Sequence, residues 1–342
     1  MNLSERKKKI LSAVVDESIK TAEPVSSKEV QEKYMSEFSP ATIRNELMAL
    51  EEMGFLSQPH TSSGRVPTAE GYKMYVEELM QLKKLSKKES EQIKESFNDK
   101  LVNIDDILQK TAKTISDVTN YASIVYYGIS DIAIVDKILL IPVSSKSTLI
   151  VVSTDLGIIK QESNLVRGSE DDLRQASKIL TKVFNGKKLE EVKSGSTLLT
   201  DELIRYKDIF YAIIQILTER DTNFAKNVVV SGKEKLLNYP EYHDIDKLKK
   251  AFSIFDNHQA LYPLISGNEN LEISVKVGGD QDSGLTDCSI ISATYKLNGK
   301  QVGSTSVVGP VRMDYGKVIS ILKNVTDLLE HSILDNKGDQ NE

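Results

Sequence analysis

Two short helices with strong start signals, followed at once by a polar hairpin, occupy residues 24–68 and constrain the fold more than any other feature. Ser26 can cap a helix, and Glu29, three residues later, can reach back to its backbone N–H. Ser39 and Pro40 begin a second helix, because serine supplies a cap oxygen and proline suits the first helical position. This order predicts a winged helix-turn-helix, whose second short helix enters the DNA major groove.

The second of these helices has one apolar and one polar side. Ile43, Leu47 and Leu50 recur at helical spacing and are expected to point into a core. The residues off this stripe are Thr42, Arg44, Asn45 and Met48. Arginine can bond guanine, and asparagine adenine, through paired hydrogen bonds, so Arg44 and Asn45 are the best candidates for reading bases. An exposed Arg-Asn pair is also common on a helix that meets only water.

A hairpin follows this helix. Gly54 can take the left-handed conformation that ends the helix. Residues 55–58 and 65–67 then predict two short strands, and the residues at 59–64 tolerate a tight turn. Hydroxyl groups and Arg65 at such a wing suit phosphate oxygens or a narrow minor groove, although an ordinary polar hairpin has the same composition. With the reading helix, the candidate DNA-binding residues are Ser39, Thr42, Arg44, Asn45, His60, Thr61, Ser62, Ser63 and Arg65.

Several runs carry a family resemblance. Residues 39–47, 50–56 and 59–68, the last reading PHTSSGRVPT, resemble the heat-inducible transcription repressors of the HrcA family. Residues 287–291 and the run VGPVRMDY at 308–315 resemble the C-terminal signature of the same family. The resemblance implies a dimeric repressor of chaperone operons that binds an inverted-repeat operator in double-stranded DNA. It also implies control by heat and by a chaperonin.

Charge and composition limit the function classes. The formal net charge of -6 argues against a general polyanion binder, because affinity without sequence choice comes from excess lysine and arginine. Residues 1–85 hold nearly equal numbers of basic and acidic groups, so positive charge must act locally. The run 6–9, Arg-Lys-Lys-Lys, is a candidate phosphate contact and is equally typical of a solvated helix face.

An enzyme is not expected. The four histidines are scattered without the spacing of metal ligands, and no glycine-rich loop with a Lys-Ser ending is present, so neither a metal nor another cofactor is predicted. The single cysteine, Cys288, lies in an apolar alternating stretch and is expected to be buried. It also excludes an internal disulfide, which suits a reducing compartment. With no targeting or membrane-spanning stretch, the predicted location is cytoplasmic.

Beyond the wing, strands and helices alternate in blocks. Strands are expected within 125–159, helices from 170 to about 224, a strand at 228–230 and further helices through 264. Strands are expected again at 271–277, 288–297 and 302–308. Strands on both sides of a helical block suggest one sheet domain with an insertion. An apolar helix in the block fits either core or a dimer contact. Its residues are Leu203, Ile204, Ile209, Phe210, Ile213, Ile214 and Leu217.

These patterns predict an α+β fold, a winged helix-turn-helix followed by a mixed sheet domain with a mainly helical insertion. The resemblance implies that the sheet domain is GAF-like and that the insertion forms the dimer. The predicted parts are a DNA-binding domain at 1–82, a charged linker helix at 83–103, a sheet domain at 104–165 and 225–335, an insertion at 166–224 and a disordered tail at 336–342. A metabolite-responsive winged-helix regulator, with a small ligand in the sheet domain, is the alternative function.

Overall fold

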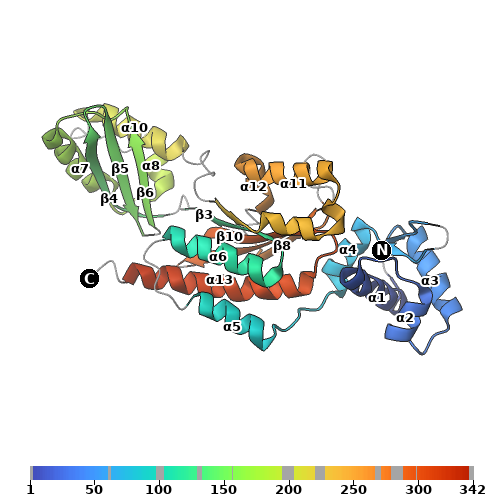
Figure 1. The fold of residues 1–342 in the computed structure, drawn as a ribbon. Helices are drawn as coiled ribbons and strands as arrows, with labels where there is room; N and C mark the ends of the chain where they lie inside the picture. The colour runs from blue at the N-terminus through green and yellow to red at the C-terminus, as the bar shows by residue number, and fades with distance from the viewer. Residues whose placement is uncertain are drawn as a thin grey trace. The chain divides into compact units, whose positions relative to one another are not determined.

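A computed structural model gives the arrangement of the chain (Figure 1). It describes residues 3–60, 63–97, 104–128, 133–155, 157–194, 204–219, 228–265, 271–278, 288–297 and 299–338. The chain divides into two compact units. Unit 1 comprises Met1–Tyr126, Val229–Thr294 and Ser304–Glu342, and unit 2 comprises Tyr127–Val228 and Tyr295–Gly303.

The N-terminal part of unit 1 is a winged helix-turn-helix. Its helices are α1 (Glu5–Thr21), α2 (Ser27–Tyr34), α3 (Pro40–Glu52) and α4 (Ala69–Met74). Between α3 and α4, strands β1 (Leu56–Ser57) and β2 (Val66–Pro67) pair antiparallel as the wing hairpin. Val25, between α1 and α2, adds a bridge to Arg65, with both backbone N···O distances 2.8 Å. A π-helical turn, η1 (Tyr75–Leu79), follows α4.

The start and stop signals read from the sequence act as expected. Ser26 and Glu29 form the full capping box of α2. At the end of α3, Gly54 has φ +84° and its N–H donates to the carbonyl of Glu51 at 2.9 Å. The N–H of Phe55 donates to the carbonyl of Leu50 at 3.0 Å, which completes a Schellman motif. The helix therefore stops where the wing must begin.

The rest of unit 1 is built on a five-stranded sheet of order β7-β3-β10-β9-β8. The strands are β3 (Ala122–Tyr127), β7 (Val228–Ser231), β8 (Ile273–Lys276), β9 (Cys288–Leu297) and β10 (Lys300–Pro310). Figure 1 shows α6 (Ile104–Thr119) and α13 (Tyr315–Gly338) packed side by side on this sheet. Two short 3-10 turns, η4 (Lys233–Asn238) and η5 (Pro240–Tyr242), precede α11 (Ile245–Asp256) and α12 (His258–Ile265). Strands from both sides of the insertion thus share one sheet, as the sequence suggested.

Helix α5 (Lys87–Ser96) lies within the segment expected as a charged linker helix. It packs against α6 and α13, and Ile93 is buried. Glu89 forms an ion pair with Lys317 of α13 at 2.5 Å, and this hydrogen bond lowers the pKa of Glu89 to about 2. Ile93 and the Glu89–Lys317 ion pair thus connect α5 to the sheet-containing part of unit 1.

Helix α13 was not expected from the sequence, although its buried residues recur at helical spacing. They include Val318, Ile319, Ile321, Leu322, Val325, Leu329 and Ile333. The helix continues to Gly338 and so overlaps the tail expected at 336–342. Residues 339–342 lie outside the described ranges.

Unit 2 contains a separate three-stranded meander, β4 (Val135–Ser144), β5 (Ser147–Thr154) and β6 (Gly157–Ser163), in that order. Its helices are α7 (Glu170–Phe184), α8 (Leu189–Ser194) and α10 (Lys207–Glu219). The backbone N–H groups of Ile138 and Leu140 donate to hydroxyls of α7, at 3.0 and 2.9 Å, so α7 covers the free edge of β4. The meander, expected within the sheet domain, therefore belongs to unit 2, which begins at Tyr127 rather than near residue 166.

Candidate nucleic-acid interface

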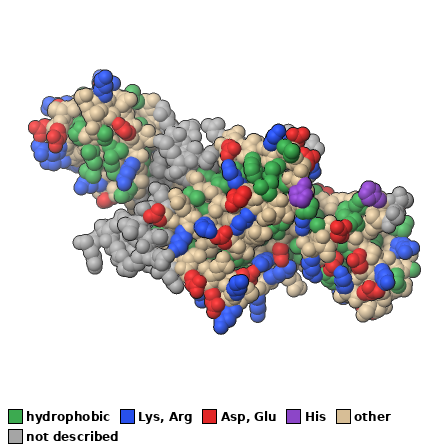
Figure 2. Space-filling view, viewed as in Figure 1, with side chains coloured by type: hydrophobic (Ala, Val, Ile, Leu, Met, Phe, Trp, Pro, Cys, Tyr) green, Lys and Arg blue, Asp and Glu red, His purple; other side chains and the backbone are tan. Residues whose placement is uncertain are grey.

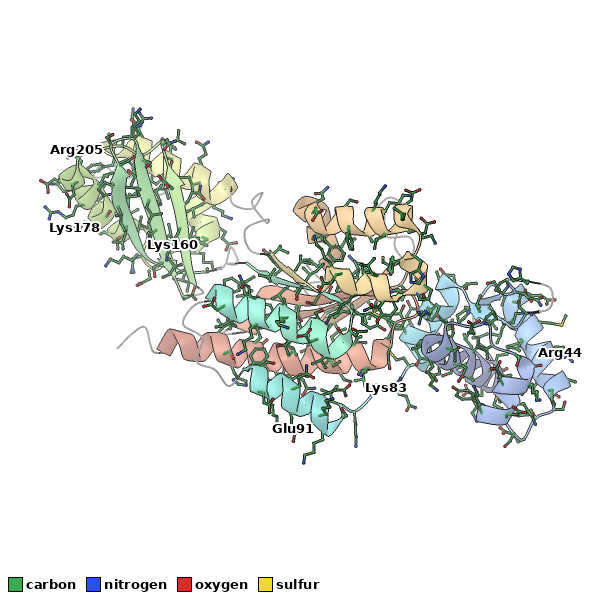
Figure 3. The ribbon with its side chains drawn as sticks, viewed as in Figure 1. Arg44, Lys83, Glu91, Lys160, Lys178 and Arg205 are labelled. Carbon is green, nitrogen blue, oxygen red and sulfur yellow. The ribbon has the colours of Figure 1, made fainter. Side chains whose placement is uncertain are left out.

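Helix α3 has the two-sided character that a reading helix needs. Ile43, Leu47 and Leu50 are buried, whereas Arg44 and Asn45 are exposed. Figure 3 shows Arg44 on α3 at the outer edge of the winged helix-turn-helix. Across the described ranges, no hydrogen bond or ion pair holds Arg44 or Asn45. Both side chains are therefore available to a partner outside the chain.

The beginning of α3 is closed by its own hydroxyls. The Ser39 Oγ accepts a hydrogen bond from the backbone N–H of Thr42 at 3.1 Å and lies 2.9 Å from the Thr42 Oγ1. Pro40 occupies the first turn, where its missing N–H removes no helical hydrogen bond. Ser39 and Thr42 thus satisfy the polar groups at this end of α3 within the chain itself.

The turn of the wing is held by Ser63. Its Oγ accepts from the backbone N–H of His60 at 3.0 Å and donates to the His60 carbonyl at 2.7 Å. Gly64 has no room for a Cβ, which would collide with the backbone of Val25. Ser63 thus shapes the turn, and His60 remains exposed at its start. The other two wing candidates, Thr61 and Ser62, lie outside the described residues.

Arg65 is tied to α3. Its Nε donates to Glu51 at 2.8 Å, and only 14% of the Arg65 side chain is exposed. The sequence suggested a free cation that reaches phosphate or the minor groove. In the chain without DNA, the ion pair with Glu51 ties the wing to α3.

Glu46 is a buried carboxylate on α3 that the sequence did not single out. The Nζ of Lys7 donates to its Oε2 at 2.7 Å and the Nε of Arg6 to its Oε1 at 2.6 Å. Both cations belong to α1, and Lys8 of the same run pairs with Glu78 at 3.1 Å. Three of the four cations at 6–9 therefore have partners within the domain. The first two hold the reading helix against α1.

Replacing Glu46 by glutamine is expected to lower the free energy of unfolding by about 1–2 kcal/mol near neutral pH, because hydrogen bonds to a charged group are lost. The hydrogen bond from Lys7, helped by Arg6, lowers the pKa of Glu46 in the folded protein. Its stabilisation is therefore present above the unfolded-state pKa of about 4.3 and is lost as pH falls through the folded value.

Urea titrations of the wild type and Glu46→Gln at several pH values measure this difference. The matched control is Glu32→Gln, which removes an exposed i,i+4 pair with Lys28 at 3.7 Å and is expected to change little. A gap between wild type and Glu46→Gln that stays constant down to the acid limit would contradict the role given to Glu46.

Metal-binding groups, the cysteine and apolar helices among the described residues bear on functions other than DNA binding. No three His, Cys, Asp or Glu side chains there are grouped to hold a metal ion. Cys288 is buried, as expected, with its Sγ 2.8 Å from the hydroxyl of Tyr242. No helix among the described residues is long and apolar enough to cross a membrane. In Figure 2, basic and acidic side chains alternate over the visible face of the winged helix-turn-helix, in keeping with its near-neutral composition.

A capped, outward-facing α3 followed by a wing defines a winged-helix DNA-binding protein. Family models give the family within this class. Residues 2–81 match the winged helix-turn-helix transcription repressor, HrcA DNA-binding domain. Residues 105–319 match the HrcA protein C-terminal domain. The chain therefore belongs to the HrcA family of heat-inducible transcription repressors. Its members are transcription repressors rather than enzymes, and the fold is the expected α+β combination.

Individual relatives agree over nearly the full length. The chain is 36% identical over 334 residues to the heat-inducible transcription repressor HrcA of Natranaerobius thermophilus, covering 96% of each chain. It is 34% identical over 345 residues to that of Pelotomaculum thermopropionicum, covering 97% of this chain and 99% of the relative. A crystal structure described as that of a hypothetical protein shares the fold, with TM-score 0.59, 22% identity and 98% of each chain covered.

Proposed function

We propose that this protein represses heat-shock (chaperone) operons by binding an inverted-repeat operator as a dimer, under control of heat and chaperonin availability. The observation that carries the proposal is the pair Arg44 and Asn45, exposed and unpaired within the described chain on a helix closed at both ends. A two-fold dimer presents two such helices to successive major grooves, which is the geometry that an inverted repeat requires.

The proposed contacts divide by chemistry. Arg44 and Asn45 read base edges, since their side chains match guanine and adenine. Hydroxyl and backbone groups at the start of α3 and on the wing bind phosphate, which fixes register without reading sequence. These phosphate-side residues are Ser39, Thr42, His60, Thr61, Ser62 and Ser63. Arg65 reaches a phosphate or the narrow minor groove from the wing, which its ion pair with Glu51 ties to α3.

The dimer contact is proposed on the outer face of the meander in unit 2. The apolar helix that the sequence offered as either core or a dimer contact corresponds to α10. Phe210, Ile213 and Leu217 of that helix are buried in the core of unit 2. On strand β4, by contrast, Leu139 and Ile141 are 36% and 44% exposed. Apolar side chains exposed in a row on one sheet face mark an association surface.

The register makes this face continuous. Leu139 lies opposite Val151, and Ile141 lies opposite Leu149, on neighbouring antiparallel strands. Ile158 of β6 adds a further exposed apolar side chain. Figure 2 shows hydrophobic side chains grouped over the part of unit 2 where Figure 1 draws β4 to β6. A second copy of the same face would cover them through a self-complementary two-fold contact.

Chaperonin dependence is supported by the topology of the five-stranded sheet. Strand β3 lies between β7 and β10, whose residues are about one hundred and about one hundred and eighty positions further along the chain. Such non-local pairing folds slowly and leaves apolar surface exposed during folding, which is the state that chaperones bind. A cytoplasmic location is part of the same proposal.

Operator binding with and without chaperonin tests the proposal. DNA from upstream of the chaperone operons of the source genome is footprinted with the full-length protein after refolding from denaturant. Protection of an inverted repeat is expected, with the active fraction rising when chaperonin and ATP are present. No protection, or an active fraction that is independent of chaperonin, would refute it. Thermal shifts against a metabolite panel test the alternative regulator, because a ligand raises the apparent stability of the native state.

A further inference from the structure

The run from Pro310 to Tyr315, between β10 and α13, is not explained by DNA contacts. Arg312 in this run is largely buried, with 16% of its side chain exposed. Its Nε donates to Glu241 Oε1 at 2.5 Å and its Nη2 donates to Oε2 at 3.3 Å. The guanidinium also lies over the ring of Tyr239 at 5.7 Å. A paired, stacked guanidinium has a fixed position and direction that a lysine ammonium could not reproduce.

The same guanidinium reaches the DNA-binding domain. Its Nη1 lies 3.5 Å from the carbonyl oxygen of Ile19. Ile19 is in the last turn of α1, where carbonyl groups lack helical partners and the helix dipole favours a positive charge. Arg312 therefore joins η5 of the sheet-containing part to the end of α1 in the winged helix-turn-helix.

Two tyrosines make a second connection beside it. The ring of Tyr72, on α4, lies 6.3 Å from the ring of Tyr315 at the start of α13. The Tyr72 hydroxyl lies 3.1 Å from the Oγ of Ser18 on α1, and the Tyr315 hydroxyl lies 2.8 Å from the Oγ of Ser289 on β9. Burial raises the pKa of Tyr72 to about 12.

The chain that leaves the DNA-binding domain is fastened to the same place. The Nζ of Lys83 donates to Asp314 Oδ2 at 2.8 Å, and the backbone N–H of Lys83 donates to the carbonyl of Gly316 at 3.4 Å. A Cβ on Gly316 would collide with the carbonyl oxygen of Gln81, so only glycine allows this approach. Figure 3 shows Lys83 beside the first turn of α13.

From these contacts we infer that Arg312, paired with Glu241, is a positioning residue for operator binding: it sets the orientation of the winged helix-turn-helix on the sheet-containing part of unit 1. The inference rests on the proposed inverted-repeat operator. When the two DNA-binding domains of a dimer are held at a fixed angle, binding of one half-site places the second domain at its own half-site. When the domains are held loosely, the effective concentration of the second domain at its half-site is lower, and operator affinity falls. Loss of the native sheet-containing part would release the same contacts, which links its folding to repression.

A distance measurement tests the junction without DNA. Spin labels are placed at Lys28→Cys on α2 and Lys323→Cys on α13, both exposed, with each labelled chain diluted into unlabelled protein. The native Cys288 is buried and so protected from labelling. A single narrow distance is expected for the starting protein and a broadened one after Arg312→Ala or Glu241→Gln. The matched control, Arg174→Ala, removes an exposed pair with Asp171 in unit 2 and should leave the width unchanged. An unchanged width after Arg312→Ala would overturn the inference.

Binding to designed duplexes supplies the functional readout. Arg312→Ala is expected to lose about tenfold on the inverted repeat and no more than about twofold on a single half-site. It should also discriminate less against a repeat whose half-sites are moved apart by about 5 base pairs, half a helical turn. Equal losses on both duplexes would make Arg312 a general stability residue and overturn the inference. If the starting protein does not prefer the inverted repeat, the proposed function fails, and the distance measurement still decides the junction.

Discussion

Arg44→Ala is expected to lower operator affinity by about 2–6 kcal/mol for a dimer, because each half-site loses a bidentate base contact worth about 1–3 kcal/mol. Discrimination at one base pair in each half-site should relax at the same time. The expectation follows from the position of Arg44, exposed on α3 and without a partner among the described residues. Fluorescence anisotropy with operator duplexes that carry single base changes measures both effects.

Two further variants separate base reading from charge. Arg44→Lys keeps the positive charge and loses the planar fork, so it should retain binding to unrelated DNA while losing base preference. Lys73→Ala removes an exposed cation from α4 and should change base preference at no position. If Arg44→Ala is folded and keeps the operator affinity and base preference of the wild type, α3 does not read DNA bases through Arg44.

Local signals made the DNA-binding part predictable. The capping box at Ser26, the proline after Ser39 and the glycine at position 54 each act within a few residues, so the sequence alone locates the ends of α2 and α3. The apolar stripe through Ile43 and Leu47 likewise fixes which side of α3 is free. The predicted exposure of Arg44 and Asn45 is confirmed, and their contacts with DNA remain a proposal.

Interactions between distant residues were not predictable in the same way. Glu46 is buried and paired because α1 brings Arg6 and Lys7 to it, which no local pattern in the sequence indicates. Arg65 looked like a free cation because nothing in the sequence places Glu51 beside it. The meander was expected in the same sheet domain as the later strands, and it forms a separate sheet. The sequence pattern of a strand indicates its length and its buried face. It does not indicate which strand it pairs with, because tertiary packing decides the pairing.

The second large effect is expected on the outer face of the meander. Ile141→Asp places a charge where the proposed dimer contact would bury it, and an unpaired charge at the centre of an interface costs about 3–5 kcal/mol. The monomer should remain folded, because Ile141 is already 44% exposed within its own chain. Sedimentation at micromolar concentration should show half the mass of the wild type. Operator affinity should fall at least about a hundredfold, since one reader then binds without the second.

The matched control for this face is Ile245→Asp, which puts the same charge on an isoleucine of α11 in unit 1 that is 67% exposed. It should leave both mass and operator affinity unchanged. Thermal melting of all three proteins shows whether any loss comes from unfolding rather than dissociation. An Ile141→Asp protein that stays dimeric would move the contact to another surface. The Ile141→Asp protein could also be monomeric and still bind the inverted repeat as tightly as the wild type. That result would contradict the need for a dimer. A single near-neutral DNA-binding domain has no excess of lysine and arginine to make up for the affinity lost with the second half-site.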